Sequence, residues 1–180
     1  MSNQTREPLL HIATLGKTVG VKGDVKLHIK TDFPEQFVQG ASFLINRKDR
    51  LTLSYVDLDR LLVKVNNISN PEDAKKFTNV KLFATREETR KNCHLNDDEY
   101  FWFDLEDCQV YEDGKLLGVV QEVQRIAETN YLSIKTAQEL VTSGQAKGFL
   151  VPFTLPFKES VDIESKSITL KGAFDILEAS

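Results

Sequence analysis

At residues 99–105 the chain reads Glu99-Tyr100-Phe101-Trp102-Phe103-Asp104-Leu105, four consecutive aromatic residues between acidic ones. Alternation along a β-strand would direct Tyr100 and Trp102 to one face and Phe101 and Phe103 to the other. One face could then anchor a core while the other meets a partner, because aromatic residues dominate both cores and interfaces. The alternative is a strand buried on both sides, with all four rings in the core.

Length and composition indicate a globular protein. The 180 residues suit one large domain or two small ones, and 41% of them are hydrophobic and 28% charged. No run approaches the roughly 18 apolar residues of a membrane span. Residues 1–8 contain no apolar signal core, so we expect a cytoplasmic protein with no membrane partner. Cys93 and Cys108 form no CxxC pair and fit free thiols in a reducing compartment.

The charge is divided unevenly along the chain. Residues 1–92 hold 16 Lys and Arg against 11 Asp and Glu, a balance of +5. Residues 93–180 hold 7 against 16, a balance of −9. A basic half could face phosphate, whereas an acidic half would attract a cationic partner, of which ribosomal proteins and histones are typical. Ordinary scatter of surface charge is the alternative.

The first half predicts a small closed β-barrel at residues 8–86. Asn70 and Pro71 mark the clearest helix start, since Asn caps helices and Pro suits the first turn. Asp32 and Pro34 suggest a shorter helical turn. The expected strands are residues 9–15, 24–30, 42–46, 51–55, 61–65 and 80–84.

Three glycines, Gly16, Gly20 and Gly23, predict a glycine-rich loop after the first strand. Gly16-Lys17-Thr18 invites comparison with a phosphate-binding loop, but that motif needs another glycine where the chain has His11, and a helix afterwards. The following residues alternate like a strand, so we reject nucleotide hydrolysis.

The lysines of this region allow two interpretations. Lys17, Lys22 and Lys26 could contact RNA phosphate, or they could simply form a solvated face.

Residues 87–98 are polar and charged and are interpreted as a linker, which could contain a helical turn. A second small β-domain is expected at residues 99–178. Asp113-Gly114 predicts a two-residue hairpin, and Gly118 suggests a bulge in the return strand. Other expected strands are residues 108–111, 115–126, 131–135, 149–153 and 167–170, with a short helix near 136–142 and a final turn at 174–178.

No arrangement of residues indicates catalysis. The histidines, His11, His28 and His94, lie far apart, and there is no zinc-ligand spacing, HExxH or GxSxG. Cys108 falls within an expected strand, which favours a structural thiol over a nucleophile. We therefore predict a protein without enzymatic activity, metal or cofactor.

Two motifs in order carry a family resemblance. Gly16-x-x-x-Gly20-x-x-Gly23-Asp24-Val25-Lys26, followed by Thr31-Asp32-Phe33-Pro34-Glu35, resembles the N-terminal domain of the RimM family of ribosome maturation factors. Glu99-Tyr100-Phe101-Trp102-x-Asp104-Leu105-x-x-Cys108-x-Val110, then Gly114-x-x-x-Gly118, resembles the C-terminal PRC-barrel domain of that family. Leu150-Val151-Pro152-Phe153 and Val161-Asp162 resemble later strands of the same domain.

The resemblance implies a mostly β fold of two small barrels, a translation-factor-like six-stranded barrel and a PRC barrel. It also implies a non-enzymatic assembly factor that binds the head of the immature 30S subunit. The implied contact is the small-subunit head protein numbered nineteen, and the implied role is maturation of the 3′ domain of 16S rRNA. The paired aromatics that matter for ribosome association in the family fall on Tyr100 and Phe101, just before Trp102. The family's usual second Tyr is Phe101 here.

Other function classes stay open at this point. The second domain could be a PRC-barrel scaffold or regulatory module unrelated to ribosomes, although the glycine-rich first domain argues against this. An enzyme that uses the Gly16 loop is a third option, which a nucleotide-induced thermal shift would reveal. No feature requires self-association, so we expect a monomer.

Overall fold

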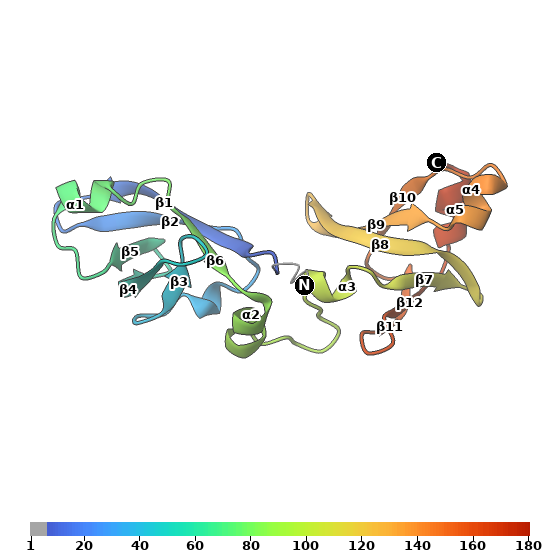
Figure 1. Cartoon of the computed structure of the whole chain (residues 1–180), viewed down its shortest axis with the longest axis horizontal. Helices are drawn as coiled ribbons and strands as arrows, with labels where there is room; N and C mark the ends of the chain where they lie inside the picture. The colour runs from blue at the N-terminus through green and yellow to red at the C-terminus, as the bar shows by residue number, and fades with distance from the viewer. Residues whose placement is uncertain (1–6) are drawn as a thin grey trace, which may run out of the picture. The chain divides into compact units, whose positions relative to one another are not determined.

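The computed structural model describes residues 7–180 as two compact units, the first ending at His94 and the second beginning at Leu95 (Figure 1). The expectation of no export signal rests on residues 1–8, and residues 1–6 of that segment lie outside the described part. Among residues 7–180, no helix is both long and apolar enough to cross a membrane.

The first unit is a six-stranded closed barrel, as predicted. Its strands follow the order β1-β2-β5-β4-β3-β6, and all neighbouring pairs are antiparallel. The strands are β1 (Leu10–Val19), β2 (Asp24–Ile29), β3 (Ser42–Leu44), β4 (Arg50–Asp57), β5 (Leu62–Val65) and β6 (Lys81–Ala84). The helical segments are η1 (Pro34–Gln36), α1 (Pro71–Lys75) and α2 (Arg86–Asn92).

Alternation along the strands fills this barrel. In β2, Val25 and Leu27 are fully buried, whereas Asp24 and Lys26 lie on the outer face. The start of α1 is confirmed, because the Asn70 side chain accepts a hydrogen bond from the Asp73 amide at 2.9 Å. The Asp32 cap is not formed at η1, where the residue before the helix is Phe33 and no side chain caps it.

The predicted glycine-rich loop is shorter than expected. Strand β1 continues through Gly16 to Val19, and only Gly20 and Gly23, with φ of 66° and 77°, belong to the turn. Gly16 is needed for close packing instead, since a Cβ there would lie 2.4 Å from Nε2 of His28. A strand, β2, follows the turn where a phosphate-binding loop requires a helix.

Half of the segment expected as a linker, residues 87–92, belongs to the helix α2. Thr85 and Glu88 form a capping box, in which the Thr85 hydroxyl accepts from the Glu88 amide and the Glu88 carboxylate accepts from the Thr85 amide. Arg50 on β4 pairs with Glu88 at 2.7 Å. These contacts attach α2 to the barrel.

The second unit contains a six-stranded sheet in the order β10-β9-β8-β7-β12-β11. Only the β7–β12 pair is parallel among the ladders of this sheet in residues 95–180. Its strands are β7 (Gln109–Glu112), β8 (Lys115–Ile126), β9 (Thr129–Thr136), β10 (Gly148–Pro152), β11 (Lys158–Asp162) and β12 (Ser167–Leu170). Its helices are α3 (Trp102–Leu105), α4 (Gln138–Thr142) and α5 (Ala173–Glu178).

Two turn signals of this unit are confirmed. Asp113 and Gly114 join β7 to β8 with φ of 48° and 76°, as a two-residue hairpin requires. The bulge lies beside Gly118, which pairs with Val110, while Tyr111 pairs with Leu116. Strand β11 was expected only from the family resemblance of Val161-Asp162, because its residues Lys158–Asp162 lack an apolar alternation.

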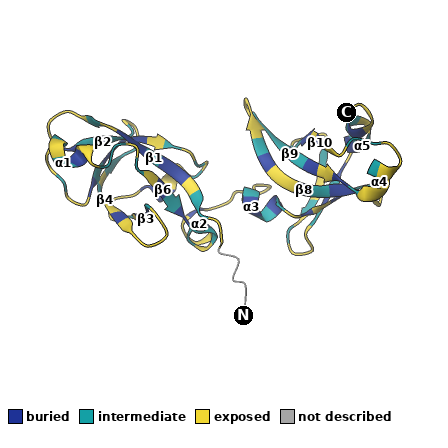
Figure 2. Ribbon diagram, turned by 45° about the horizontal axis from the view of Figure 1, so that its top comes forward, coloured by how far each residue is buried: buried dark blue, intermediate teal, exposed yellow. Residues whose placement is uncertain are grey.

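Each unit has its own hydrophobic core. Figure 2 shows the buried residues along β1 in one unit and along β8 and β9 in the other. In the second unit the Glu112 carboxylate accepts from the amides of Gly172 and Phe174, which attaches the start of α5 to β7. The structure thus supports two independent β-domains.

The close approach of two strands at Gly118 generates a stability prediction. A Cβ at this position would lie 2.1 Å from the carbonyl oxygen of Lys135 and 2.8 Å from Cγ2 of Ile134. We expect Gly118→Ala to lower the free energy of unfolding of the second unit by about 1–3 kcal/mol. Urea unfolding followed by Trp102 fluorescence measures this, with exposed Leu116→Ala as the control on the same strand. Equal stability of the two variants would contradict the assigned strand register.

Candidate protein-docking site

Only part of the aromatic stretch, Trp102–Leu105, forms the short helix α3, and Tyr100 and Phe101 precede it without forming a strand, so the predicted strand is wrong. Burial nevertheless alternates as a strand would produce it: Phe101, Phe103 and Leu105 are buried, whereas Tyr100 and Trp102 are half-buried. Leu105 belongs to the core of the second unit, and α3 lies against β8. Packing of the buried and the half-buried side chains therefore determines the backbone conformation of this segment. The alternation of residue types along the sequence does not determine it.

The four aromatic rings of residues 100–103 fall into two pairs. Phe101 and Phe103 stack almost in parallel, with ring centroids 5.2 Å apart and planes 9° apart. Tyr100 and Trp102 instead pack against the core of the second unit and keep part of their surface exposed. Of the three residues predicted to bind a ribosomal protein, Tyr100 and Trp102 are thus partly accessible and Phe101 is 7% exposed.

A lysine far along the chain holds the end of α3. The Lys166 ammonium donates to the carbonyl oxygens of Asp104 and Glu106, at 2.9 Å each. A cation at a helix C-terminus satisfies carbonyls that have no partner within the helix. Cys108 also donates to the Asp104 carbonyl through its thiol, at 3.3 Å. These contacts fix the direction in which the helix presents its rings.

A third ring joins the exposed pair. Phe153, the first residue after β10, meets Tyr100 edge to face with the centroids 6.0 Å apart. We call Tyr100, Trp102 and Phe153 the aromatic patch. All three pack on the core of the second unit, yet none is fully buried. Aromatic residues with one covered side and one accessible side are typical anchors of protein interfaces.

Two cations lie over this patch. Lys158 Nζ lies 5.5 Å from the ring centroids of both Tyr100 and Phe153, and the Arg125 guanidinium lies 5.6 Å from that of Trp102. Lys158 also pairs with Asp98 at 3.9 Å. Such cation–π contacts hold rings in place at modest energetic gain. Burial, and secondarily the negative charge of Asp98, raises the pKa of the Tyr100 hydroxyl.

Exposed apolar surface continues beside the patch. Leu155 lies two residues after Phe153 in the β10–β11 loop and is 79% exposed. A large exposed apolar side chain close in the chain to partly exposed aromatic rings indicates a surface suited to a protein partner.

The three lysines proposed for RNA contacts do not form one group. Lys17 and Lys26 line one hollow of the first barrel, and Lys22 lines another. The Lys26 ammonium donates to the carbonyl oxygen of Arg60 at 2.8 Å, so it supports the β4–β5 turn. All three extend from the outer surface of the barrel.

The described part of the chain contains no cluster of metal-binding side chains, and its two cysteines are buried. Among residues 7–180 no three His, Cys, Asp or Glu side chains are grouped to hold a metal ion. Cys93 and Cys108 are free and buried. Burial, with a smaller effect of the Glu35 charge, raises the pKa of the Cys93 thiol to about 11, which disfavours the thiolate nucleophile.

The fold and the patch define a two-domain β protein, and sequence comparison identifies its family. The model described as the RimM N-terminal domain matches residues 10–89, and the model described as the RimM PRC barrel domain matches residues 102–176. The chain therefore belongs to the RimM family.

Relatives match over nearly their full length. The chain is 57% identical over 180 residues to a protein of Sulfurimonas denitrificans named Ribosome maturation factor RimM, with all of both chains covered. It is 47% identical to the protein of the same name from Nitratiruptor sp., with 95% of this chain and 98% of that one covered. For the Sulfurovum sp. protein of this name the identity is 44%, with 94% of each chain covered.

Sequence reasoning missed part of the site. Phe153, Arg125 and Lys158 contact the aromatic stretch from segments more than twenty residues away, and no local pattern links them to it. Residues 149–153 were predicted as a strand, and nothing in that pattern indicates that Phe153 would contact Tyr100.

The contacts of Lys166 predict the stability of α3. Lys166→Met keeps the aliphatic stem but removes both hydrogen bonds, so the second unit should lose about 0.5–1.5 kcal/mol. Trp102, the one tryptophan of the chain, reports the urea transition by its fluorescence. Lys171→Met, at another exposed lysine of this unit, serves as the control and should change little. Indistinguishable midpoints for both variants would refute this role of Lys166.

Proposed function

We propose that the protein is a non-enzymatic assembly factor of the small ribosomal subunit and that the aromatic patch, together with Phe101, docks it onto the subunit head. The observation that carries this proposal is a partly exposed aromatic cluster in the half of the chain whose net charge is −9. Full-length similarity to proteins named ribosome maturation factors supports the ribosomal role.

We infer that the head protein numbered nineteen is the docking partner. Ribosomal proteins are basic, so the acidic second unit would attract one over a distance, and the aromatic rings would hold it after contact. Phe101 stacks on Phe103 and so supports Tyr100 and Trp102, its chain neighbours, from within the same short segment. The first unit, with its excess of positive charge, would contact 16S rRNA phosphate through Lys17, Lys22 and Lys26.

The proposed mechanism is a population shift. A factor that binds one head conformation more tightly than others favours that conformation during maturation of the 3′ domain of 16S rRNA. It leaves when the mature surface no longer offers the same contacts. This role requires no cofactor and no second copy of the chain, and it places the protein in the cytoplasm, where subunits assemble.

A PRC-barrel scaffold unrelated to ribosomes is the alternative function. The first unit favours the ribosomal role, because residues 10–89 match the N-terminal domain of the same family as the PRC barrel. A scaffold that used only its second domain would not need this partner domain.

Binding to the isolated head protein tests the docking proposal. Tyr100→Ala/Phe101→Ala should raise the Kd for that protein about tenfold or more, and should reduce co-sedimentation with immature small subunits. Because Phe101 is buried, circular dichroism must show that the double variant is folded. Leu155→Ser, at a 79% exposed position, should also weaken binding several-fold without affecting folding.

The matched control is Val38→Ser, an exposed apolar residue of the first unit. It should leave the affinity for the head protein unchanged. If all three variants bind like the wild-type chain, the partner does not contact the aromatic patch. If the wild-type chain binds neither the head protein nor any ribosomal particle, the assembly role itself is wrong.

A further inference from the structure

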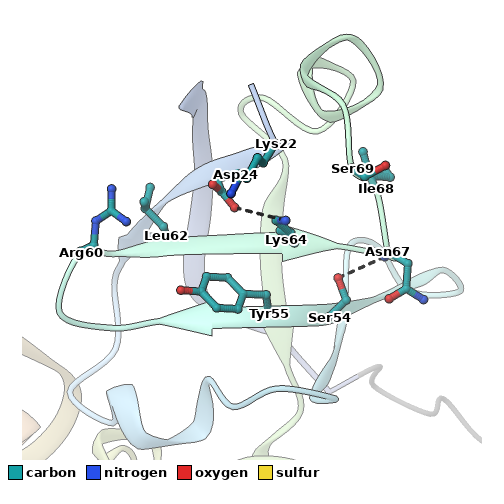
Figure 3. A pocket seen from close by; sticks show the side chains of 10 residues that line it. All are labelled: Lys22, Asp24, Ser54, Tyr55, Arg60, Leu62, Lys64, Asn67, Ile68 and Ser69. Atoms are coloured by element: carbon teal, nitrogen blue, oxygen red, sulfur yellow. Dashed lines mark hydrogen bonds and ion pairs between the residues drawn. The ribbon is translucent and has the colours of Figure 1, made fainter. Parts of the chain in front are cut away.

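The outer face of the first barrel carries a polar hollow of about 580 Å³ across β2, β5 and β4 (Figure 3). Two lysines, one arginine and one aspartate line it, together with a tyrosine and several amide and hydroxyl groups. The lining residues used below are Lys22, Asp24, Tyr55, Arg60, Lys64 and Asn67.

Strand register brings the central side chains together. Val63 and Val65 of β5 point into the barrel and are buried, so Lys64 between them points outward. Tyr55 of β4 pairs directly with Lys64, and residues directly opposite one another in a ladder share a face. The register shift between Leu53 and Tyr55 makes this pairing possible, and such bulges often re-aim side chains at binding sites.

The rim of the hollow is fixed by the backbone. Gly23, with φ of 77°, lets the β1–β2 turn touch the loop before α1, since a Cβ there would lie 2.9 Å from the Ile68 carbonyl oxygen and the Asn70 amide. Lys22 is thereby placed next to the hollow. On the opposite wall, the Asn67 amide donates to the Ser54 hydroxyl at 3.1 Å (Figure 3).

The charges of this hollow favour an anion. Lys64 lies 4.0 Å from Asp24, which neutralises one of the three cations. In the described part of the chain, the side chains of Lys22 and Arg60 form no ion pair. Asp57, near the Tyr55 hydroxyl at 3.4 Å, accepts from the Arg60 amide and so orders the turn that carries Arg60. Two uncompensated cations therefore border the hollow.

Tyr55 adds an exposed aromatic ring to the hollow, which a site that binds only phosphate does not need. Its side chain is 41% exposed and lies along β4 between the arginine end and the Asn67 end of the hollow (Figure 3). An exposed ring beside cations is the arrangement by which proteins hold single-stranded nucleic acid, with the base stacked and the backbone neutralised. An acidic peptide would use the cations but would gain little from the ring.

We propose that this hollow binds an unstacked nucleotide of single-stranded RNA, with the base on Tyr55 and the flanking phosphates at Lys22 and Arg60. The inference deepens the proposed function, since it assigns a particular RNA site to the first unit. It also adds Tyr55 and Arg60 to the lysines considered above.

Fluorescence anisotropy with a fluorescein-labelled single-stranded RNA dodecamer of mixed sequence tests this on the full chain. Lys22→Gln/Arg60→Gln should weaken binding about tenfold and flatten the dependence of affinity on salt. Lys48→Gln/Lys81→Gln removes the same charge from exposed positions of this unit outside the hollow, and should change the affinity less than twofold. Equal losses in both double variants would overturn the site in favour of diffuse electrostatic attraction.

The ring is tested separately. Tyr55→Thr, which retains a residue suited to a strand, should weaken RNA binding about tenfold, whereas Tyr55→Phe should bind like the wild type. An unchanged affinity of Tyr55→Thr, or no RNA binding by the wild-type chain, would refute the proposal. If polyglutamate displaces the RNA equally well from wild type and Tyr55→Thr, the hollow is an acidic-peptide site instead.

These results are separable from the docking proposal. The dodecamer assay contains no ribosomal protein, and Tyr100→Ala/Phe101→Ala should bind the RNA normally. Loss of the RNA site alone would leave binding to the head protein intact, and failure of docking alone would leave the RNA affinities unchanged.

Discussion

The aromatic patch depends on the hydrogen bonds that Lys166 donates to the end of α3. Its ammonium satisfies the carbonyl oxygens of Asp104 and Glu106, so a one-turn helix that would not be stable alone persists. With the helix fixed, Leu105 enters the core, and Tyr100 and Trp102 lie at its edge. Lys166 thus has a structural role, because it stabilises the segment that carries the aromatic rings.

In the proposals above the two units recognise different partners, although both are β-domains, one a closed barrel and the other built on a six-stranded sheet. Both are β-domains that bury alternate side chains and leave an outer face free for polar or aromatic residues. In the first unit that face presents cations around Tyr55, which suits RNA. In the second it presents rings and the exposed Leu155 in the half of the chain whose net charge is −9, which suits a basic protein. A factor that contacts RNA and protein together can favour one arrangement of both.

Much of the fold was predictable from local patterns. The Asn70 cap, the Asp113-Gly114 hairpin and the six barrel strands follow from residue type and alternation. The strand predicted for residues 99–105 was wrong. Every second side chain can also be buried in a segment that contains a short helix, as it is here. The remainder of the site depends on Phe153 and Lys158, whose contacts with Tyr100 exist only after folding.

The central claim is that a ribosomal partner covers the aromatic patch. Trp102 is the single tryptophan, so incorporation of 5-fluorotryptophan gives one ¹⁹F resonance from the patch itself. We expect this resonance to shift or broaden, and to saturate at one equivalent, when the unlabelled head protein numbered nineteen is added to the full chain. A resonance that stays unchanged while the two proteins co-elute as a complex would contradict the account.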